Sequence, residues 1–292
     1  MAGALQGLRV LDASTVIAGP FTAALLAGCQ QISTTQGGAI GANRQQSMSM
    51  LLSPQQVDQM SEKAYAEETG KARKKGALNT NAAMTTRVRA IADRLISQVA
   101  VYRSDALRWK WEVNVENSPE VNAYCMAGGK IMVYSGIIEK LKLSDDELAQ
   151  IMGHEMAHAL REHTRERMSE AYTRQLGLSL LSAATGGRYD GYLDMANQVA
   201  TYAYSMPNSR EHEIEADMMG LELAARAGYN PHAAISLWQK MAQAGGSQPP
   251  QFLSTHPSRS TRISELQARI PVVMPLYENA VKRHPTPAKA KF

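Results

Sequence analysis

Residues 144–158, SDDELAQIMGHEMAH, are the stretch from which the fold of this chain can be worked out. Ser144 followed three residues later by Glu147 is the capping-box pattern of a helix N-terminus, and acidic residues in the first turn suit the helix dipole. Apolar residues then recur at Leu148, Ile151 and Met152, which is the spacing of one helix face. We therefore predict a helix over residues 144–170.

The same stretch ends in two histidines four residues apart, His154 and His158, with Glu155 directly after the first. Histidines at this spacing project from one helix face, so their ring nitrogens can meet one Zn²⁺ and Glu155 can reach a water on it. A solvated helix with two surface histidines is the alternative. It is weakened by the uncharged neighbours of the pair, which are Ile151, Met152, Met156, Ala157, Ala159 and Leu160.

A catalytic zinc needs a third protein ligand and an open position for water. Asn208 and Ser209 are N-cap residues for a second predicted helix over 209–228, whose acidic candidates are Glu211, Glu213, Glu215 and Asp217. Glu213 and Asp217 share one face, so one could bind zinc while the other accepts the N–H of a ligand histidine. Glu211 and Glu215 also share a face, and spacing alone does not choose between the pairs.

The composition of the 292 residues limits the class of protein. With 44% hydrophobic and 20% charged residues, no three-residue period and no long repeat, the chain is globular rather than disordered, collagen-like or solenoid. Two cysteines cannot build a disulfide framework, so stability must come from a core, a metal or both. The net charge of +4 is spread along the chain, so we expect no nucleic-acid partner.

A change of periodicity upstream of the metal motif indicates a small sheet. Two scaffold helices, over 53–76 and 81–100, are followed by alternating apolar and polar residues from Trp109 to Val115 and by two short predicted strands within 121–136. An edge strand can hold an extended peptide through backbone hydrogen bonds. The candidate substrate edge comprises Asn122, Ala123, Gly128 and Gly129, although an ordinary three-stranded sheet packed on a helix would give the same pattern.

Together, HEMAH (154–158) and SREHEIEAD (209–217) resemble the family of zinc metallopeptidases that contains HtpX and the CAAX prenyl endopeptidases. The likeness is nearest to its soluble bacterial lipoprotein members and covers about residues 52–270. It includes NAY (122–124), GG (128–129), VYSG (133–136) and STHP (254–257) in order. The resemblance implies an α+β, mostly helical zincin-like metalloprotease domain over 53–270, with a small β-sheet lining the active-site groove.

The resemblance also implies a ligand set with one Zn²⁺ per chain. It selects Glu213 as the third ligand beside His154 and His158, with Asp217 as the hydrogen-bond partner of His154. The chain departs from relatives at Ala127, where many members have proline, and by Cys125 in the same strand. Because the transmembrane helices of the HtpX and prenyl-endopeptidase branches are missing, we do not carry over an intramembrane or prenyl-protein activity.

The expected reaction is peptide hydrolysis with Glu155 as general base, which takes a proton from the zinc-bound water and delivers it to the leaving amine. The first candidate for a second oxyanion stabiliser is His256 in STHP, because the family motif places that loop near the site; Tyr202, Tyr204 and Arg210 are weaker candidates. Alternatively, Thr-His-Pro only caps a last helix over 258–270. Residues 165–205 could cover the cleft as a lid.

The amino terminus has two possible interpretations. An uncharged stretch ending in Leu-Ala-Gly-Cys at 26–29, followed by a polar segment, favours a lipoprotein signal over 1–28, lipid on Cys29 and a flexible linker over 29–52. Residues 4–27 separately resemble the start of a family III CoA-transferase, which would make them a fused extension or the product of a mis-set start. Nothing downstream continues that family's pattern.

We therefore expect a zinc-dependent metalloendopeptidase of the bacterial cell envelope, lipid-anchored and facing the periplasm. Its partners would be unfolded or misfolded polypeptides, and the membrane through the anchor. The alternative is a non-catalytic or latent zinc-binding assembly or chaperone-like factor, in which His163 or His212 could close the metal site. His212 is adjacent to Glu213 and should point about 100° away, which argues against it. Residues 271–292 are expected to be a solvated tail.

Overall fold

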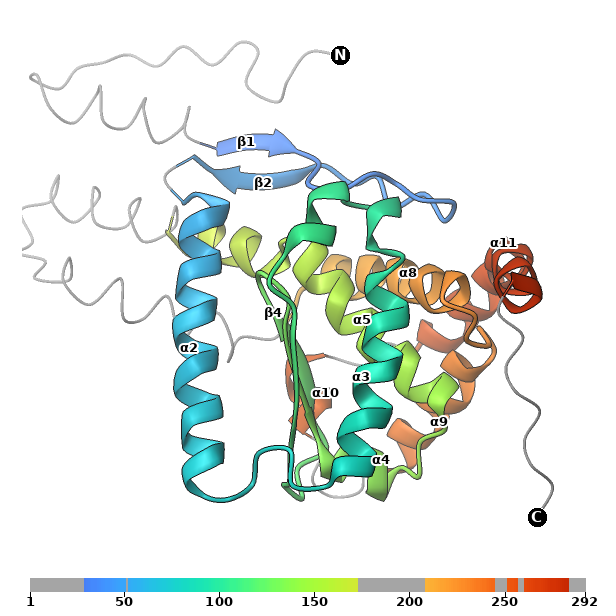
Figure 1. The fold of residues 1–292 in the computed structure, drawn as a ribbon. Coiled ribbons are helices and arrows are strands. Elements are labelled where there is room, and N and C mark those ends of the chain that lie inside the picture. Colours follow the sequence, from blue (N-terminus) through green and yellow to red (C-terminus); the bar gives the residue numbers. More distant parts are fainter. Residues whose placement is uncertain (1–28, 51, 173–207, 245–250, 257–259, 284–292) are drawn as a thin grey trace, which may run out of the picture.

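The computed structural model describes residues 29–50, 52–172, 208–244, 251–256 and 260–283 (Figure 1). The predicted signal segment 1–28 and most of the predicted lid, including Tyr202 and Tyr204, lie outside these ranges. The described part is mostly helical with small sheets, as the sequence predicts.

The predicted three-stranded sheet is confirmed. Its strands are β3 (Glu112–Glu116), β4 (Ala123–Met126) and β5 (Lys130–Tyr134), in the order β3-β5-β4. Strand β5 pairs in parallel with β3 and antiparallel with β4. Gly128 and Gly129 make the turn between β4 and β5 with φ of 74° and 82°, a backbone region that favours glycine. Because β5 is the middle strand in this order, β4 lies at an edge of the sheet.

Helices cover both faces of the sheet, because the strand residues alternate between two apolar clusters. Met126 and Met132 pack with Tyr65 of α2 (Pro54–Lys74), while Ile131 and Val133 belong to the main core with α3 (Ala82–Ile96) and α5 (Asp145–Leu160). In Figure 1 the sheet stands between α2 on one side and α3 with α5 on the other. The capping box predicted at Ser144 is present, and Ser53 forms a second one at the start of α2.

The first metal-motif helix is interrupted, which corrects the continuous helix expected over 144–170. Helix α5 ends at Leu160, and a turn at 161–162 follows, in which Glu162 has a φ of 55°. Residues 163–172 are helical again. The chain therefore changes direction just after His158.

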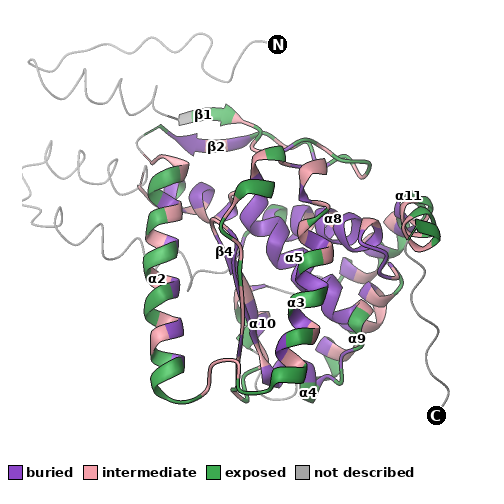
Figure 2. Cartoon of the chain, in the orientation of Figure 1, coloured by how far each residue is buried: buried purple, intermediate pink, exposed green. Residues whose placement is uncertain are grey.

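The second metal-motif helix, α8 (Arg210–Arg226), begins and ends close to the predicted bounds of 209–228. It packs along α5, and both helices are almost wholly buried (Figure 2). Gly153 and Gly220 meet where they cross: a Cβ added to Gly220 would lie 2.6 Å from the backbone nitrogen of His154. The absence of two side chains lets the backbones touch there.

Three further helices close the core around α8. They are α9 (Ala233–Ala244), α10 (Gln251–Thr255) and α11 (Arg262–Arg283), while α4 (Ser135–Lys140) and two short 3₁₀ turns, Val99–Val101 and Ser104–Arg108, join the earlier elements. Helix α11 continues through Pro271 and Pro275, so the solvated tail expected from residue 271 is corrected. Val273 is completely buried, which is why the chain stays helical and packed beyond 270.

The flexible linker expected over 29–52 is also corrected. Strands β1 (Cys29–Ile32) and β2 (Gln46–Ser49) pair antiparallel, from Cys29 with Ser49 to Ile32 with Gln46. Gln46 and Met48 are buried, and Arg44 forms ion pairs with carboxylates of the helical core. The polar composition that indicated a tether instead supplies partners for buried charges. None of the helices in the described ranges has the length and apolarity needed to span a bilayer.

We predict that Gly220→Ala lowers the free energy of unfolding by about 1–3 kcal/mol, because the new methyl group forces α5 and α8 apart. Gly70→Ala in α2 is the matched control, since a Cβ there meets nothing within 4 Å. That variant should be more stable than the parent by about 0.5–1 kcal/mol, as expected when helical glycine becomes alanine. Urea unfolding of both variants is the measurement, and equal effects at the two positions would contradict the close crossing.

Candidate metal centre and active site

The predicted ligands from the two helices meet in one buried cluster. His154, His158, Glu213 and His256 each bring a ligand atom within 4.8 Å of the others. His154 and His158 come from one face of α5, and Glu213 from the first turns of α8 after the N-cap Ser209. His256 follows α10 directly.

The distances within this cluster fit a tetrahedral metal ion. Donors bound at about 2.05 Å from one zinc lie about 3.3 Å apart. The Nε2 atoms of His154 and His158 are 3.1 Å apart, and Nε2 of His158 is 3.4 Å from Oε1 of Glu213. Nδ1 of His256 is 3.3 Å from Nε2 of His154. Two imidazoles and a carboxylate are the donor set that zinc prefers, so the residues fit this metal.

The four acidic residues that spacing could not separate have different surroundings. Glu213 is in the cluster, and Asp217 accepts a hydrogen bond of 3.0 Å from Nδ1 of His154, the position that the family resemblance gives each of them. Glu215 points into a neighbouring buried group, whereas Glu211 is exposed. This bond from His154 to Asp217 fixes the ring of His154 with Nε2 toward the cluster.

Glu155 lies beside the cluster on the cleft side. It is 4% exposed, and burial raises the pKa of its carboxyl group. Within the described residues its Oε1 receives no hydrogen bond, and Nε2 of His256 is 3.3 Å away. A buried carboxylate with an unused oxygen at this place can accept a proton from a water molecule.

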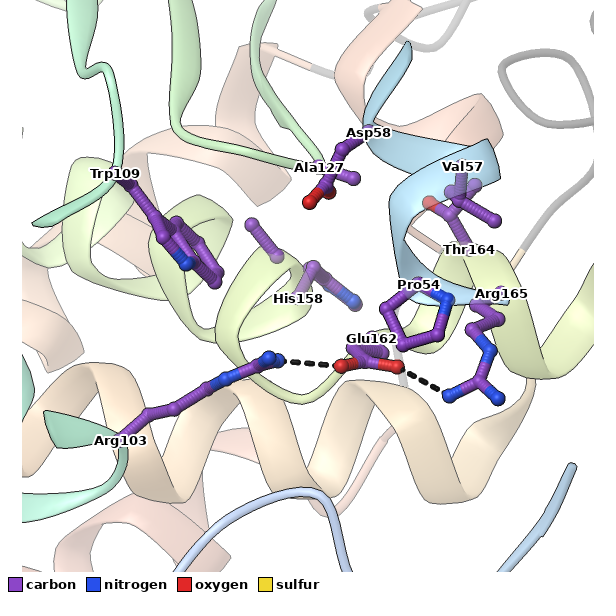
Figure 3. A pocket seen from close by; sticks show the side chains of 11 residues that line it. Pro54, Val57, Asp58, Arg103, Trp109, Ala127, His158, Glu162, Thr164 and Arg165 are labelled. Atoms are coloured by element: carbon purple, nitrogen blue, oxygen red, sulfur yellow. Dashed lines mark hydrogen bonds and ion pairs between the residues drawn. The ribbon is translucent and has the colours of Figure 1, made fainter. Parts of the chain in front are cut away.

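The cleft itself is lined by residues of strand β4 and by the metal cluster. Asn122, Ala123 and Cys125 face the same hollow as Glu155 and His256. Gly128 and Gly129 do not line it, because they lie in the turn at the far end of β4. The structure thus brings two of the four predicted substrate-edge residues to the cleft. A second pocket, shown in Figure 3, reaches His158 beside α2 and the turn after α5.

His256 lies closer to the metal ligands than the sequence-based prediction implies. Its Nδ1 is 2.9 Å from Oε1 of Glu213, and Asn208 approaches the same nitrogen at 3.2 Å. It is therefore a possible fourth donor as well as a neighbour of Glu155. Arg210, a weaker candidate, is exposed at the start of α8.

Sequence reasoning missed Arg262, which is 1% exposed and joins the two carboxylates of α8. Its Nη2 donates to Oδ1 of Asp217 at 2.5 Å, and its Nη1 is 3.1 Å from Oε2 of Glu213. The guanidinium also stacks over the ring of Trp238 at 3.3 Å. A signal was present, because the buried positions of α11 are Arg262, Leu266, Ile270 and Val273, at steps of four, four and three. Arg262 thus occupies the apolar face of its helix.

Helix α5 with His-Glu-x-x-His, a glutamate from a second helix and a cleft beside an edge strand define the class of zincin-like zinc metallopeptidases. Residues 82–270 match Peptidase family M48, and the chain belongs to this family. Members of the family use zinc, and the cluster around His154 can hold it.

Curated proteins similar to the chain include a mitochondrial metalloendopeptidase and two bacterial proteases. The mitochondrial metalloendopeptidase OMA1 of Arabidopsis thaliana is 39% identical over 56% of this chain and 32% of its own length. The beta-barrel assembly-enhancing protease of Yersinia pestis is 25% identical over 72% of this chain and 42% of its own length. Metalloprotease YcaL of Escherichia coli is 26% identical over 52% and 59%. The chain thus spans between 32% and 59% of the length of these relatives.

We predict that Arg262→Met lowers the free energy of unfolding of the zinc-free protein by about 3–5 kcal/mol, because two buried carboxylates lose their shared cation. Urea unfolding in the presence of a chelator measures this. The control is Arg87→Met, which removes an exposed ion pair of 2.6 Å with Asp145 and should cost less than about 1 kcal/mol. A similar loss in both variants would show that Arg262 does not neutralise the site.

Proposed function

We propose that this chain is a zinc-dependent endopeptidase that hydrolyses peptide bonds in unfolded or misassembled cell-envelope proteins. The observation that carries the proposal is the buried ligand set of His154, His158 and Glu213, with Glu155 at the cleft beside edge strand β4. Zinc bound there would polarise the scissile carbonyl and acidify the attacking water.

The chain's own residues account for the proton transfers. Glu155 accepts the proton of the attacking water and passes it to the leaving amine, a role supported by its buried Oε1, which accepts no hydrogen bond from the described residues. His256 remains the proposed oxyanion stabiliser, since its Nε2 is directed toward Glu155 rather than toward the α8 carboxylates. Asp217 and Arg262 hold His154 and Glu213 in place.

Strand β4 supports an extended substrate. The carbonyl of Asn122 accepts a bond from Tyr134 in β5, and the backbone groups of successive residues alternate in direction along an antiparallel pair. The N–H and C=O of Ala123 and Cys125 therefore point away from β5, to the open edge of the sheet. Oδ1 of Asn122 accepts from the N–H of Ala123 at 2.9 Å and would have to give way before a peptide pairs with these groups. A peptide that lacks its own secondary structure can pair with them, which favours unfolded chains as substrates.

The envelope location is supported by the bacterial relatives from Yersinia pestis and Escherichia coli, one of which is named for beta-barrel assembly. We further propose that Cys29 carries lipid and anchors the protein in the membrane facing the periplasm, on the strength of Leu-Ala-Gly-Cys at 26–29. Mass spectrometry of the mature amino terminus should show a diacylglyceryl-modified Cys29. An intact Met1 would exclude the anchor.

The test of the protease is casein cleavage and bound zinc measured on the parent, Glu155→Gln and Glu213→Ala. We expect about one zinc per chain in the parent and in Glu155→Gln, with cleavage lowered at least about 100-fold in the latter. Glu213→Ala should lose most of its zinc, because one of three ligands is missing.

Other outcomes would point elsewhere. Zinc without cleavage in the parent, with cleavage gained in His256→Phe, would indicate a latent enzyme in which His256 occupies the open position. Zinc without cleavage in every variant would indicate a structural zinc protein. If the parent binds no zinc, the proposal fails.

A further inference from the structure

A second buried group lies directly behind the metal ligand His158. It contains His163, Glu166, His212 and Glu215, none of which is more than 5% exposed. His163 stacks on His212 at 4.3 Å, and Nε2 of His212 is 3.0 Å from Oε2 of Glu166. The catalytic steps proposed above use none of these side chains.

The turn after α5 is what brings His163 to His158. In an uninterrupted helix, side chains five positions apart point about 140° away from each other. Here the turn at 161–162 redirects the chain, so the rings of His158 and His163 meet. The side chain of Glu162 in this turn is held by Nη1 of Arg103 at 2.5 Å and by Nη1 of Arg165 at 2.8 Å (Figure 3). The backbone conformation with φ of 55° is therefore fixed by two ion pairs.

The two rings form the first link of a hydrogen-bonded chain. Since Nε2 of His158 faces the metal cluster, its Nδ1–H donates to Nδ1 of His163 at 2.8 Å. His163 in turn donates from Nε2 to Oε2 of Glu215 at 3.0 Å. A neutral imidazole accepts at one nitrogen and donates at the other, which matches the two contacts of His163.

Two arginines neutralise the carboxylates at the end of this row of hydrogen bonds. Arg161 donates to Oε1 of Glu215 at 2.8 Å. Arg44 binds Oε2 of Glu215 at 2.7 Å and both oxygens of Glu166, at 2.7 and 2.8 Å. Although burial acts in the opposite direction, the hydrogen bonds from Arg44 and others hold the pKa of Glu166 far below its ordinary value.

Arg44 belongs to the segment that joins β1 and β2, and its neighbour Gln46 completes the connection. Gln46 is completely buried and donates to Oε2 of Glu166 and to the carbonyl of Arg161, both at 2.7 Å. Arg161 returns a bond to the carbonyl of Arg44. The β1–β2 segment thus contacts the turn at 161–162 through the side chain of Gln46 and the backbone carbonyl of Arg44. This turn is the one that positions His163.

We propose that the β1–β2 segment, residues 29–49, is a structural part of the metal centre: Arg44, acting through Glu215 and His163, orients His158 toward the metal. His163 and Arg44 are positioning residues, because neither brings a ligand atom into the metal cluster; His163 contacts only the Nδ1 side of His158. The inference rests on the proposed function only in taking His158 as a zinc ligand. It does not need the chain to cleave peptides.

The second group is not itself a metal site in this proposal, although His163, Glu166 and His212 are near enough together to hold an ion. Both nitrogens of His163 are already bonded, and the guanidinium of Arg44 covers both oxygens of Glu166. A divalent cation there would lie beside two arginines, which its charge disfavours.

The test is the zinc affinity of the full chain, measured by competition with a chelator. We expect His163→Leu to weaken zinc binding about 10- to 100-fold, the range found when the outer partner of a ligand histidine is removed. His163→Gln should retain most of the affinity, because its amide can accept from His158 and donate to Glu215. Arg44→Met should weaken binding about 10-fold, and Arg87→Met should leave it unchanged.

Thermal unfolding of the zinc-free variants separates positioning from stability. Unchanged zinc affinity in Arg44→Met and His163→Leu, whatever their loss of thermal stability, would overturn the proposal. A second equivalent of bound zinc that disappears in His212→Gln would also overturn it, since the group would then be a metal site. If the variants lose zinc affinity as expected but the parent protein has no protease activity, the proposed function is refuted and this inference stands.

Discussion

The backbone contact between Gly153 and Gly220 is the constraint on which the rest of the structure depends. The candidate zinc ligands of α5 and α8 converge beside the point where the two helix backbones touch, and a side chain at either glycine would push the helices apart. His154 follows Gly153 directly, so the contact fixes the backbone from which its ring projects. The sheet, α9 and α11 then pack around this pair, and their apolar residues bury it completely.

Burial of the pair creates an electrostatic problem that shapes the surrounding helices. Carboxylates at the centre of a core are costly unless cations or N–H donors meet them. The protein places Arg262 between Glu213 and Asp217, and Arg44 with Arg161 against Glu166 and Glu215. Arg44 and Arg262 come from outside α5, α8 and the turn after α5. Arg44 lies between β1 and β2, and Arg262 begins α11.

The sequence was sufficient to predict the elements whose signals are local. Capping boxes, the four-residue histidine spacing and the paired glycines of the β4–β5 turn each act over a few residues, and the structure has all of them. Long-range partners could not be predicted in the same way. Residues 29–49 have the polar composition of a tether, and only Glu166 and the carbonyl of Arg161, more than 100 positions later, explain why Gln46 is buried. The turn at Glu162 likewise depends on Arg103, far upstream.

The paired strands before α2 also have a mechanical meaning. A tether would let the domain reorient freely around its attachment, whereas here residue 29 is already hydrogen-bonded to a strand that is fixed to the helices of the cleft. A force applied to the chain before residue 29 would therefore be transmitted through the paired strands to the helices around the cleft. The first strand and the cleft are thereby linked within one packed unit, and a movement of one carries the other with it.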